Sequence, residues 1–211
     1  MVKNENQIIE AFKQLAHAFQ PQLESKDKSY CEMIATSFAF DGITRGEFMN
    51  ACPQDYTWAC DIIDSMHDGI ETDDGLYKSK EYFDIFKQVK DFCKKIENGD
   101  QQEVYTELVT SRRLVHLFKP EHCFTSIQFL VRPRIEDPFI DEVIVIANMR
   151  SCNCADNLFT DWLICYTLGE MVRCAFMCAF PDFLIAEGID LVMNVGSLHI
   201  FKDKKGKRNV V

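Results

Sequence analysis

The second half of the chain carries strand-like and helix-like patterns in an order that limits the possible folds. After Thr110, three segments rich in strand-forming residues predict β-strands, namely LVHLF, TSIQFLVR and DEVIVIANMRS. Residues 157–179 predict a long, largely buried helix that ends at Pro181, and GIDLVMNVGSLHIF predicts one or two closing strands. Elements of this kind bury their apolar faces against one another, so we expect an α/β fold with long helices packed on a sheet.

The first half of the chain predicts helices and strands joined by polar loops. The expected elements are a helix over 5–19 ended by Pro21, a strand over Tyr30–Phe40, a short helix over Asp55–Met66, and a helix over 80–97. The segments HDGIETDDG and EDPFIDE predict loops, the second of them in a hairpin. No repeat or linker interrupts the 211 residues, so we expect a single domain spanning 1–211.

Composition narrows the classes of partner and the compartment. The formal net charge is −10, which argues against general nucleic-acid binding but leaves room for one bound phosphate. The ten cysteines follow a polar start without a secretory signal, so we expect reduced thiols in a cytoplasmic protein. The most apolar segment is interrupted by Asp161, Glu170 and Arg173, so no membrane span is expected.

Several fragments in a fixed order predict a pyrimidine nucleotide site. Cys123 stands five positions before Gln128. Arg150 is followed by Ser151 and stands eleven positions (161 − 150) before Asp161. The segment NVGSLH follows and ends at His199. In this hypothesis the cysteine is a nucleophile, the arginine and serine hold phosphate, and the aspartate contacts a base edge.

These fragments resemble the thymidylate synthase superfamily, and within it the phage-type deoxycytidylate hydroxymethylases. The similarity covers about residues 109 to 201 and includes Ser-Arg-Arg at 111–113, Cys-x4-Gln-Phe at 123–129 and Asn-Met-Arg-Ser at 148–151. It implies a thymidylate synthase-like fold with a mixed sheet. It also implies one-carbon transfer to a pyrimidine nucleoside monophosphate, with 5,10-methylenetetrahydrofolate as donor.

The resemblance assigns the nucleophile to Cys123. A thiolate that adds to carbon 6 of the pyrimidine makes carbon 5 nucleophilic enough to attack a one-carbon electrophile. In the family, the arginine at the position of Arg150 lies against both the cysteine and the phosphate. The alternative is that Cys123 is an ordinary buried cysteine of a strand.

The resemblance assigns phosphate binding to Arg112, Arg113, Arg150 and Ser151. Guanidinium groups offer planar paired donors to phosphate oxygens, and the serine adds a hydroxyl donor. In the family, the Ser-Arg-Arg arginines reach into the site of the neighbouring subunit. We therefore expect a homodimer. The alternative for Arg112-Arg113 is a solvated basic turn.

Base recognition is assigned to Asp161. Thymidylate synthases have an asparagine at the aligned position, whose amide matches uracil. Cytosine presents a donor at N4, and a carboxylate accepts well from it. The alternative for Asp161 is a helix N-cap.

His199 is expected to bind a sugar hydroxyl, or else to be an ordinary strand histidine. Gln128 and Asn153 complete the expected substrate contacts.

Departures from the family pattern concern mainly the folate half of the site. Asn153 replaces an aspartate that contacts folate, Asn157 replaces a glycine, and Phe201 replaces a tyrosine that contacts the sugar. The glutamate that organises catalytic water is absent from 55–66, where Asp61 is the candidate replacement. These departures favour an alternative in which the chain binds nucleotides but has lost folate chemistry.

The predicted activity is hydroxymethylation of dCMP or CMP at carbon 5 by a transferase of one-carbon groups, which would serve nucleotide biosynthesis and DNA modification. A second alternative is thymidylate synthase proper, against which Asp161 argues. A Cys-x-Cys at Cys152 and Cys154 could suggest zinc, but the usual Cys-x2-Cys pairs are absent, so no metal is expected.

Overall fold

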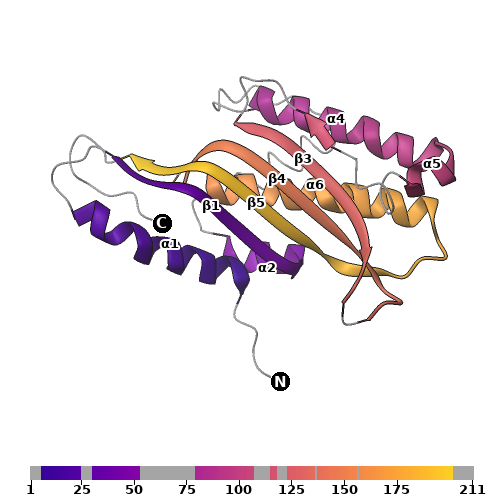
Figure 1. Ribbon diagram of the computed structural model, residues 1–211, viewed down its shortest axis with the longest axis horizontal. Helices are drawn as coiled ribbons and strands as arrows, with labels where there is room; N and C mark the ends of the chain where they lie inside the picture. Colours follow the sequence, from indigo (N-terminus) through magenta and orange to yellow (C-terminus); the bar gives the residue numbers. More distant parts are fainter. Residues whose placement is uncertain are drawn as a thin grey trace.

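A five-stranded mixed sheet forms the centre of the computed structural model, which describes residues 6–24, 30–52, 79–106, 115–117, 123–135, 137–155 and 157–201. Its strands lie in the order β1-β5-β4-β3-β2 (Figure 1). Strands β4 and β5 are parallel, whereas all other neighbours are antiparallel. The strands are β1 (Tyr30–Ile43), β2 (Val115–Leu117), β3 (Phe124–Pro133), β4 (Asp141–Asn153) and β5 (Ile185–Phe201).

Helices pack on the sheet and confirm the predicted α/β architecture. They are α1 (Gln7–Glu24), α2 (Arg45–Ala51), α4 (Ser79–Asn98), α5 (Gln101–Tyr105) and α6 (Leu158–Ala179). Helix α6 joins the parallel strands β4 and β5 and contacts both, while α4 packs on α6 and α1 lies along β1. In Figure 1 the strands pass in front of α6, and none of the labelled helices lies in front of them.

Most of the elements expected from hydrophobic periodicity are present. The predicted strands of the second half and the helices over 80–97 and 157–179 are confirmed, and a single long strand, β5, closes the sheet. The hairpin loop expected at EDPFIDE joins β3 to β4. The expected helix over Asp55–Met66 and the loop after it lie outside the described residues.

The prediction that Pro21 ends the first helix is wrong, because α1 continues to Glu24. Proline removes one helical hydrogen bond, which disfavours the extra turn locally. The side chain of Gln22 compensates: its Nε2 donates to the Glu32 carbonyl and its Oε1 accepts from the Glu32 N–H, each at 3.1 Å. These tertiary bonds hold the last turn of α1 against the edge strand β1.

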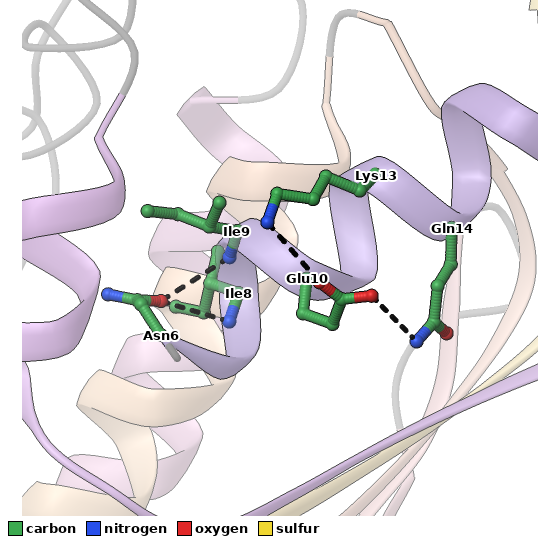
Figure 2. A network of polar contacts seen from close by, with 6 residues as sticks. All are labelled: Asn6, Ile8, Ile9, Glu10, Lys13 and Gln14. Carbon is green, nitrogen blue, oxygen red and sulfur yellow. Dashed lines mark hydrogen bonds and ion pairs between the residues drawn. The ribbon is translucent and has the colours of Figure 1, made fainter. Parts of the chain in front are cut away.

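Side-chain caps account for the helix starts that periodicity does not show. Figure 2 shows the start of α1, where Asn6 Oδ1 accepts from the backbone N–H groups of Ile8 and Ile9 at 3.0 and 3.3 Å. Helix α2 begins with a capping box between Thr44 and Glu47. Helices α2 and α5 were not predicted, since each is shorter than the roughly 11 residues over which helical periodicity can be recognised.

The core lies between the sheet and α6. Trp162 of α6 is fully buried, with its ring centroid 5.0 Å from those of Phe12, Phe38 and Phe40. By length and composition α6 could span a membrane, the one described helix with this property, but most of its side chains are buried against the sheet and α4. Its apolar composition is therefore explained by its place as a core helix.

A group of carboxylates at one end of the sheet leads to a stability prediction. Asp190 of β5 accepts from the Gly42 N–H at 2.7 Å and has Asp41 as a neighbour, while Glu142 pairs with Arg134 at 3.2 Å. Burial raises the pKa of Asp190, and the charge of Asp41 raises it further. Folding therefore favours the protonated carboxyl, and the stability that it contributes at acid pH is lost as pH rises through the raised pKa.

Asp190→Asn should accordingly raise the melting temperature at pH 7, because the amide keeps the oxygen that Gly42 needs and removes the charge. The rise should be no more than a few degrees, since water still screens a half-buried carboxylate. It should shrink at acid pH, once the pH lies below the raised pKa and the native aspartate is itself protonated. Thermal unfolding at both pH values checks this, with the exposed Asp182→Asn as control. An equal rise at both pH values would contradict the electrostatic cause.

Candidate functional site

The sheet brings Cys123 and Arg150 together at adjacent positions of neighbouring strands. The Arg150 N–H donates to the Cys123 carbonyl at 2.7 Å, just before β3 begins. Cys123 is half-buried and packs against the core, whereas Arg150 is exposed. The structure thus places the predicted nucleophile beside the predicted phosphate-binding arginine, although they are 27 residues apart (150 − 123) in the chain.

Ser151, Asn153 and His199 meet at the same end of the sheet. In the parallel register of β4 and β5, Ser151 lies opposite Ser197, and Asn153 lies opposite His199. All four side chains are half-buried. Because alternate residues of a strand point to the same side, they share the face of the sheet that is turned away from α6.

A change in the alternation of buried and exposed side chains along β4 and β5 produces this arrangement. Buried side chains follow every second position of β4 up to Met149, but the next one is Cys152, three residues on. Strand β5 changes in the same place, from Val195 to Leu198. The shift turns Cys152 towards the core and leaves Ser151 on the outer face.

Gly196 lies where the strands change phase, in line with Arg150 on one side and Ala35 on the other. Ala35 has a positive φ of 53°, which marks a local distortion of β1 at this point. A Cβ atom on Gly196 would lie 2.8 Å from the Arg150 carbonyl oxygen, too close for a backbone contact that cannot rotate away. Only glycine fits this crossing of the strands beside the site.

Gly196→Ala should therefore destabilise the fold by about 1–3 kcal/mol. It should also lower the affinity for any ligand that Arg150 and Ser151 bind. Urea unfolding measures the first effect. Gly46→Ala is the matched control, since its Cβ would meet nothing closer than Thr44 Oγ1 at 3.8 Å. In helix α2 that change should stabilise slightly, because alanine favours helix over glycine. Equal unfolding midpoints for wild type and Gly196→Ala would contradict the packing argument.

Asp161 lies in the first turn of α6 and is fully buried, with 0% of its surface exposed. Its Oδ2 accepts a hydrogen bond from the Cys152 Sγ at 3.1 Å. Asn157, not Asp161, occupies the N-cap position, so the alternative that Asp161 is a helix cap is wrong. Asp161 reaches β4 from the core side, whereas Ser151 and Asn153 lie on the opposite face.

The remaining predicted residues fall elsewhere. Gln128 is half-buried in the middle of β3, opposite Ile146. It is therefore distant from the end of the sheet that holds His199. Asn153 uses its Oδ1 to accept from the Ala155 N–H at 3.2 Å, which stabilises the turn into α6. Asp61, Arg112 and Arg113 lie outside the described residues.

Two further polar residues belong to this end of the sheet and were not predicted. Ser197 Oγ donates to Glu32 Oε1 at 2.5 Å, and Glu32 lies opposite His199 in the register of β1 and β5. Ser197 is part of the segment NVGSLH that marked the site in the sequence. Glu32 had no such signal, because it precedes Ser197 by 165 residues and only the sheet topology joins them.

The described cysteines are free thiols of differing burial. Burial raises the pKa of Cys154 to about 12, and it raises the pKa of Cys165 well above its ordinary value with a contribution from Asp161. Neither is a nucleophile at neutral pH. Among the described residues, no three His, Cys, Asp or Glu side chains are grouped so as to hold a metal ion.

Comparisons with known proteins give a likeness of fold to solved structures. No family model matches the chain, and no curated protein matches it significantly in sequence. The crystal structure of thymidylate synthase from T4 phage is similar with a TM-score of 0.49 and 15% identity, over 92% of this chain and 77% of that chain. At this level the likeness supplies no argument about activity, which must rest on the residues of the site.

Proposed function

We propose that the chain is a pyrimidine nucleotide 5-hydroxymethyltransferase that acts on dCMP or CMP. One observation carries the proposal: the strand register gathers Cys123, Arg150, Ser151, Asn153 and His199 at one end of the sheet. The sequence predicts these residues as nucleophile, phosphate ligands and sugar ligand. Their convergence from three separate strands is the arrangement that a nucleotide site requires.

Cys123 would supply the nucleophile. Its thiolate would form a bond to carbon 6 of the pyrimidine, and the electron pair of the ring double bond would pass to carbon 5. Arg150, hydrogen-bonded to the same stretch of backbone, would hold the phosphate and place a positive charge near the thiolate. Carbon 5 would use this electron pair to bond to the one-carbon unit and would then lose its proton. The bond between that unit and the folate nitrogen would break, water would add to the resulting exocyclic carbon, and elimination of Cys123 from carbon 6 would restore the ring double bond.

Phosphate binding would involve Ser151 as well as Arg150, with Arg112 and Arg113 supplied by a second subunit. Support for a homodimer comes from the outer face of the sheet, which no described helix covers and which carries polar side chains joined across strands. Asn194 Nδ2 donates to Asn148 Oδ1 at 3.0 Å, and Asn148 Nδ2 donates to Ser126 Oγ at 3.0 Å. Such an ordered face suits contact with a second copy of the sheet.

The one-carbon unit would come from 5,10-methylenetetrahydrofolate, which supplies it at the oxidation level of formaldehyde, so that no reductant is needed. Water would provide the hydroxyl group, and Asp61 is the proposed residue that orients it. Asn153 stands where the family has a folate-binding aspartate. Its amide can take part in hydrogen bonds with a pteridine but cannot supply the negative charge.

Two other functions remain as alternatives to test. Thymidylate synthase activity would require uracil recognition, which the carboxylate of Asp161 disfavours. A nucleotide-binding protein without folate chemistry would be favoured by Asn153 and by the replacement of the family's glutamate with Asp61.

Release of tritium from carbon 5 separates these three functions. Purified protein is incubated with [5-³H]dCMP or [5-³H]dUMP, with and without methylenetetrahydrofolate. We expect folate-dependent release from dCMP, together with hydroxymethyl-dCMP as product. Release from dUMP alone would establish the thymidylate synthase alternative. Binding of either nucleotide without release would establish the binding protein, and failure to bind either nucleotide would refute a nucleotide site.

A further inference from the structure

Three sulfur-containing side chains gather on one exposed face of α6, near its C-terminal end. Cys174 and Cys178 are exposed free thiols, and Met177 between them is 41% exposed. Residues three and four apart are neighbours on the surface of a helix, so Cys174 lies beside both of the others. Free cysteine is among the residue types most often buried, so two exposed thiols next to an exposed methionine are an uncommon use of a protein surface.

The thioether of Met177 is held back towards the turn that contains Cys174. Its Sδ accepts a hydrogen bond from Arg173 Nη1 at 3.2 Å. The guanidinium is itself fixed by Glu170, whose carboxylate oxygens accept from Nε and Nη2 at 2.8 Å each. The sulfur of Met177 therefore lies about one turn closer to the start of α6 than its own backbone, beside the residue that precedes Cys174.

Helical spacing decides how the two thiols can be joined. Cβ atoms four residues apart on a helix are about 5–6 Å from each other. A disulfide needs Cβ atoms about 3.5–4.5 Å apart. A direct bond between Cys174 and Cys178 would therefore distort α6, and both thiols are free. An ion placed between the two sulfur atoms meets no such difficulty, because it lengthens the bridge by a second bond.

The chemistry of the donors selects the kind of ion. Thiolates and thioethers are soft ligands, and together they favour Cu(I) among the metal ions that proteins bind. Structural zinc takes four ligands, commonly cysteine and histidine. The described residues offer no group of three His, Cys, Asp or Glu side chains that could hold such an ion. Two cysteines with one methionine suit a soft ion of low coordination number instead.

We propose that Cys174, Met177 and Cys178 form a binding site for a soft, thiophilic metal ion, with Cu(I) as the ligand. Each thiol gives its proton to water and forms a bond to the ion, so no electron is transferred. Cys174 stands 13 positions (174 − 161) beyond Asp161 in the same helix, which is about 20 Å along the helix axis. The site is therefore separate from the nucleotide site and does not depend on the proposed function.

The test titrates Cu(I), buffered by bicinchoninate under an inert atmosphere, into the whole chain. Wild type should take one equivalent of Cu(I) from the chelator. Cys174→Ser and Cys178→Ser should each weaken this binding by roughly a hundredfold or more, because losing a direct ligand exceeds the cost of an outer-shell change. Met177→Leu keeps the side-chain volume and should weaken binding by roughly tenfold. X-ray absorption should show one sulfur ligand fewer on the copper in this variant than in wild type.

Met49→Leu and Cys52→Ser are the matched controls, since Met49 is an exposed methionine of α2 and Cys52 is the free thiol three residues on. Both should keep the wild-type affinity for Cu(I), and thermal unfolding of every variant checks that it folds. Unchanged Cu(I) binding in Cys174→Ser and Cys178→Ser would overturn the inference. So would displacement of Cu(I) by an equal concentration of Zn²⁺, because the site would then not select soft ions. Either result leaves the proposed function standing.

Discussion

Cys123→Ser should reduce turnover by roughly three orders of magnitude or more while dCMP affinity changes by no more than about threefold. A serine hydroxyl is far less nucleophilic than a thiolate, so the bond to carbon 6 would not form. The phosphate contacts of Arg150 and Ser151 do not depend on the sulfur, so binding should persist. Tritium release from [5-³H]dCMP measures the first effect, and calorimetry measures the second.

Cys52→Ser provides the matched control for this experiment. Cys52, like Cys123, is a half-buried free thiol packed against the core, but it lies at the end of α2. The control should keep wild-type turnover. Normal tritium release by Cys123→Ser would show that the nucleophile is another residue. Loss of both turnover and dCMP binding in a folded Cys123→Ser protein would instead assign the cysteine a role in holding the ligand.

The sequence was sufficient to predict elements whose stability depends on their own pattern. Helix α4 and strand β4 were predicted because apolar residues recur at periods of 3.6 and 2 over long stretches. The end of α1 was not predicted correctly, because two hydrogen bonds from Gln22 to the distant strand β1 outweigh the local effect of Pro21. Tertiary contacts of this kind leave no trace in the local sequence.

In the candidate site, too, the sequence predicted which residues take part but not the tertiary contacts between them. Spacing in the sequence related Asp161 to Arg150, but it gave no indication that the Asp161 carboxylate would accept from the Cys152 thiol. That contact depends on the change of alternation around Arg150, without which Cys152 would point away from α6. Glu32 could not be predicted either, since its bond to Ser197 follows from the strand order alone.

The contact between Cys152 and Asp161 also determines what an amide at position 161 would present. In the native protein Oδ2 of Asp161 accepts from the Cys152 thiol, and in the proposed complex Oδ1 would accept from the base. In Asp161→Asn, the single amide oxygen should keep the thiol as its donor, since an NH2 group facing a thiol would leave that hydrogen bond unmade. The amide nitrogen then takes the place of Oδ1, and an acceptor becomes a donor.

We propose that the base reaches Asp161 on the core side of β4, so that Asp161→Asn should shift base preference from cytosine towards uracil. The carboxylate matches the N4 donor of cytosine, whereas the amide nitrogen matches the O4 acceptor of uracil. A mismatch leaves a buried polar group unpaired at a cost of about 1–3 kcal/mol, so wild type should favour dCMP over dUMP by about ten- to a hundredfold. The variant should narrow or invert that ratio when both nucleotides are measured by calorimetry at one pH.

Glu170→Gln is the control: it makes the same carboxylate-to-amide change in the same helix, but within the ion pair to Arg173. It should leave the ratio unaltered. Equal wild-type affinity for the two nucleotides would remove the base-recognition role from Asp161, and with it the preference for a cytidylate over a uridylate substrate.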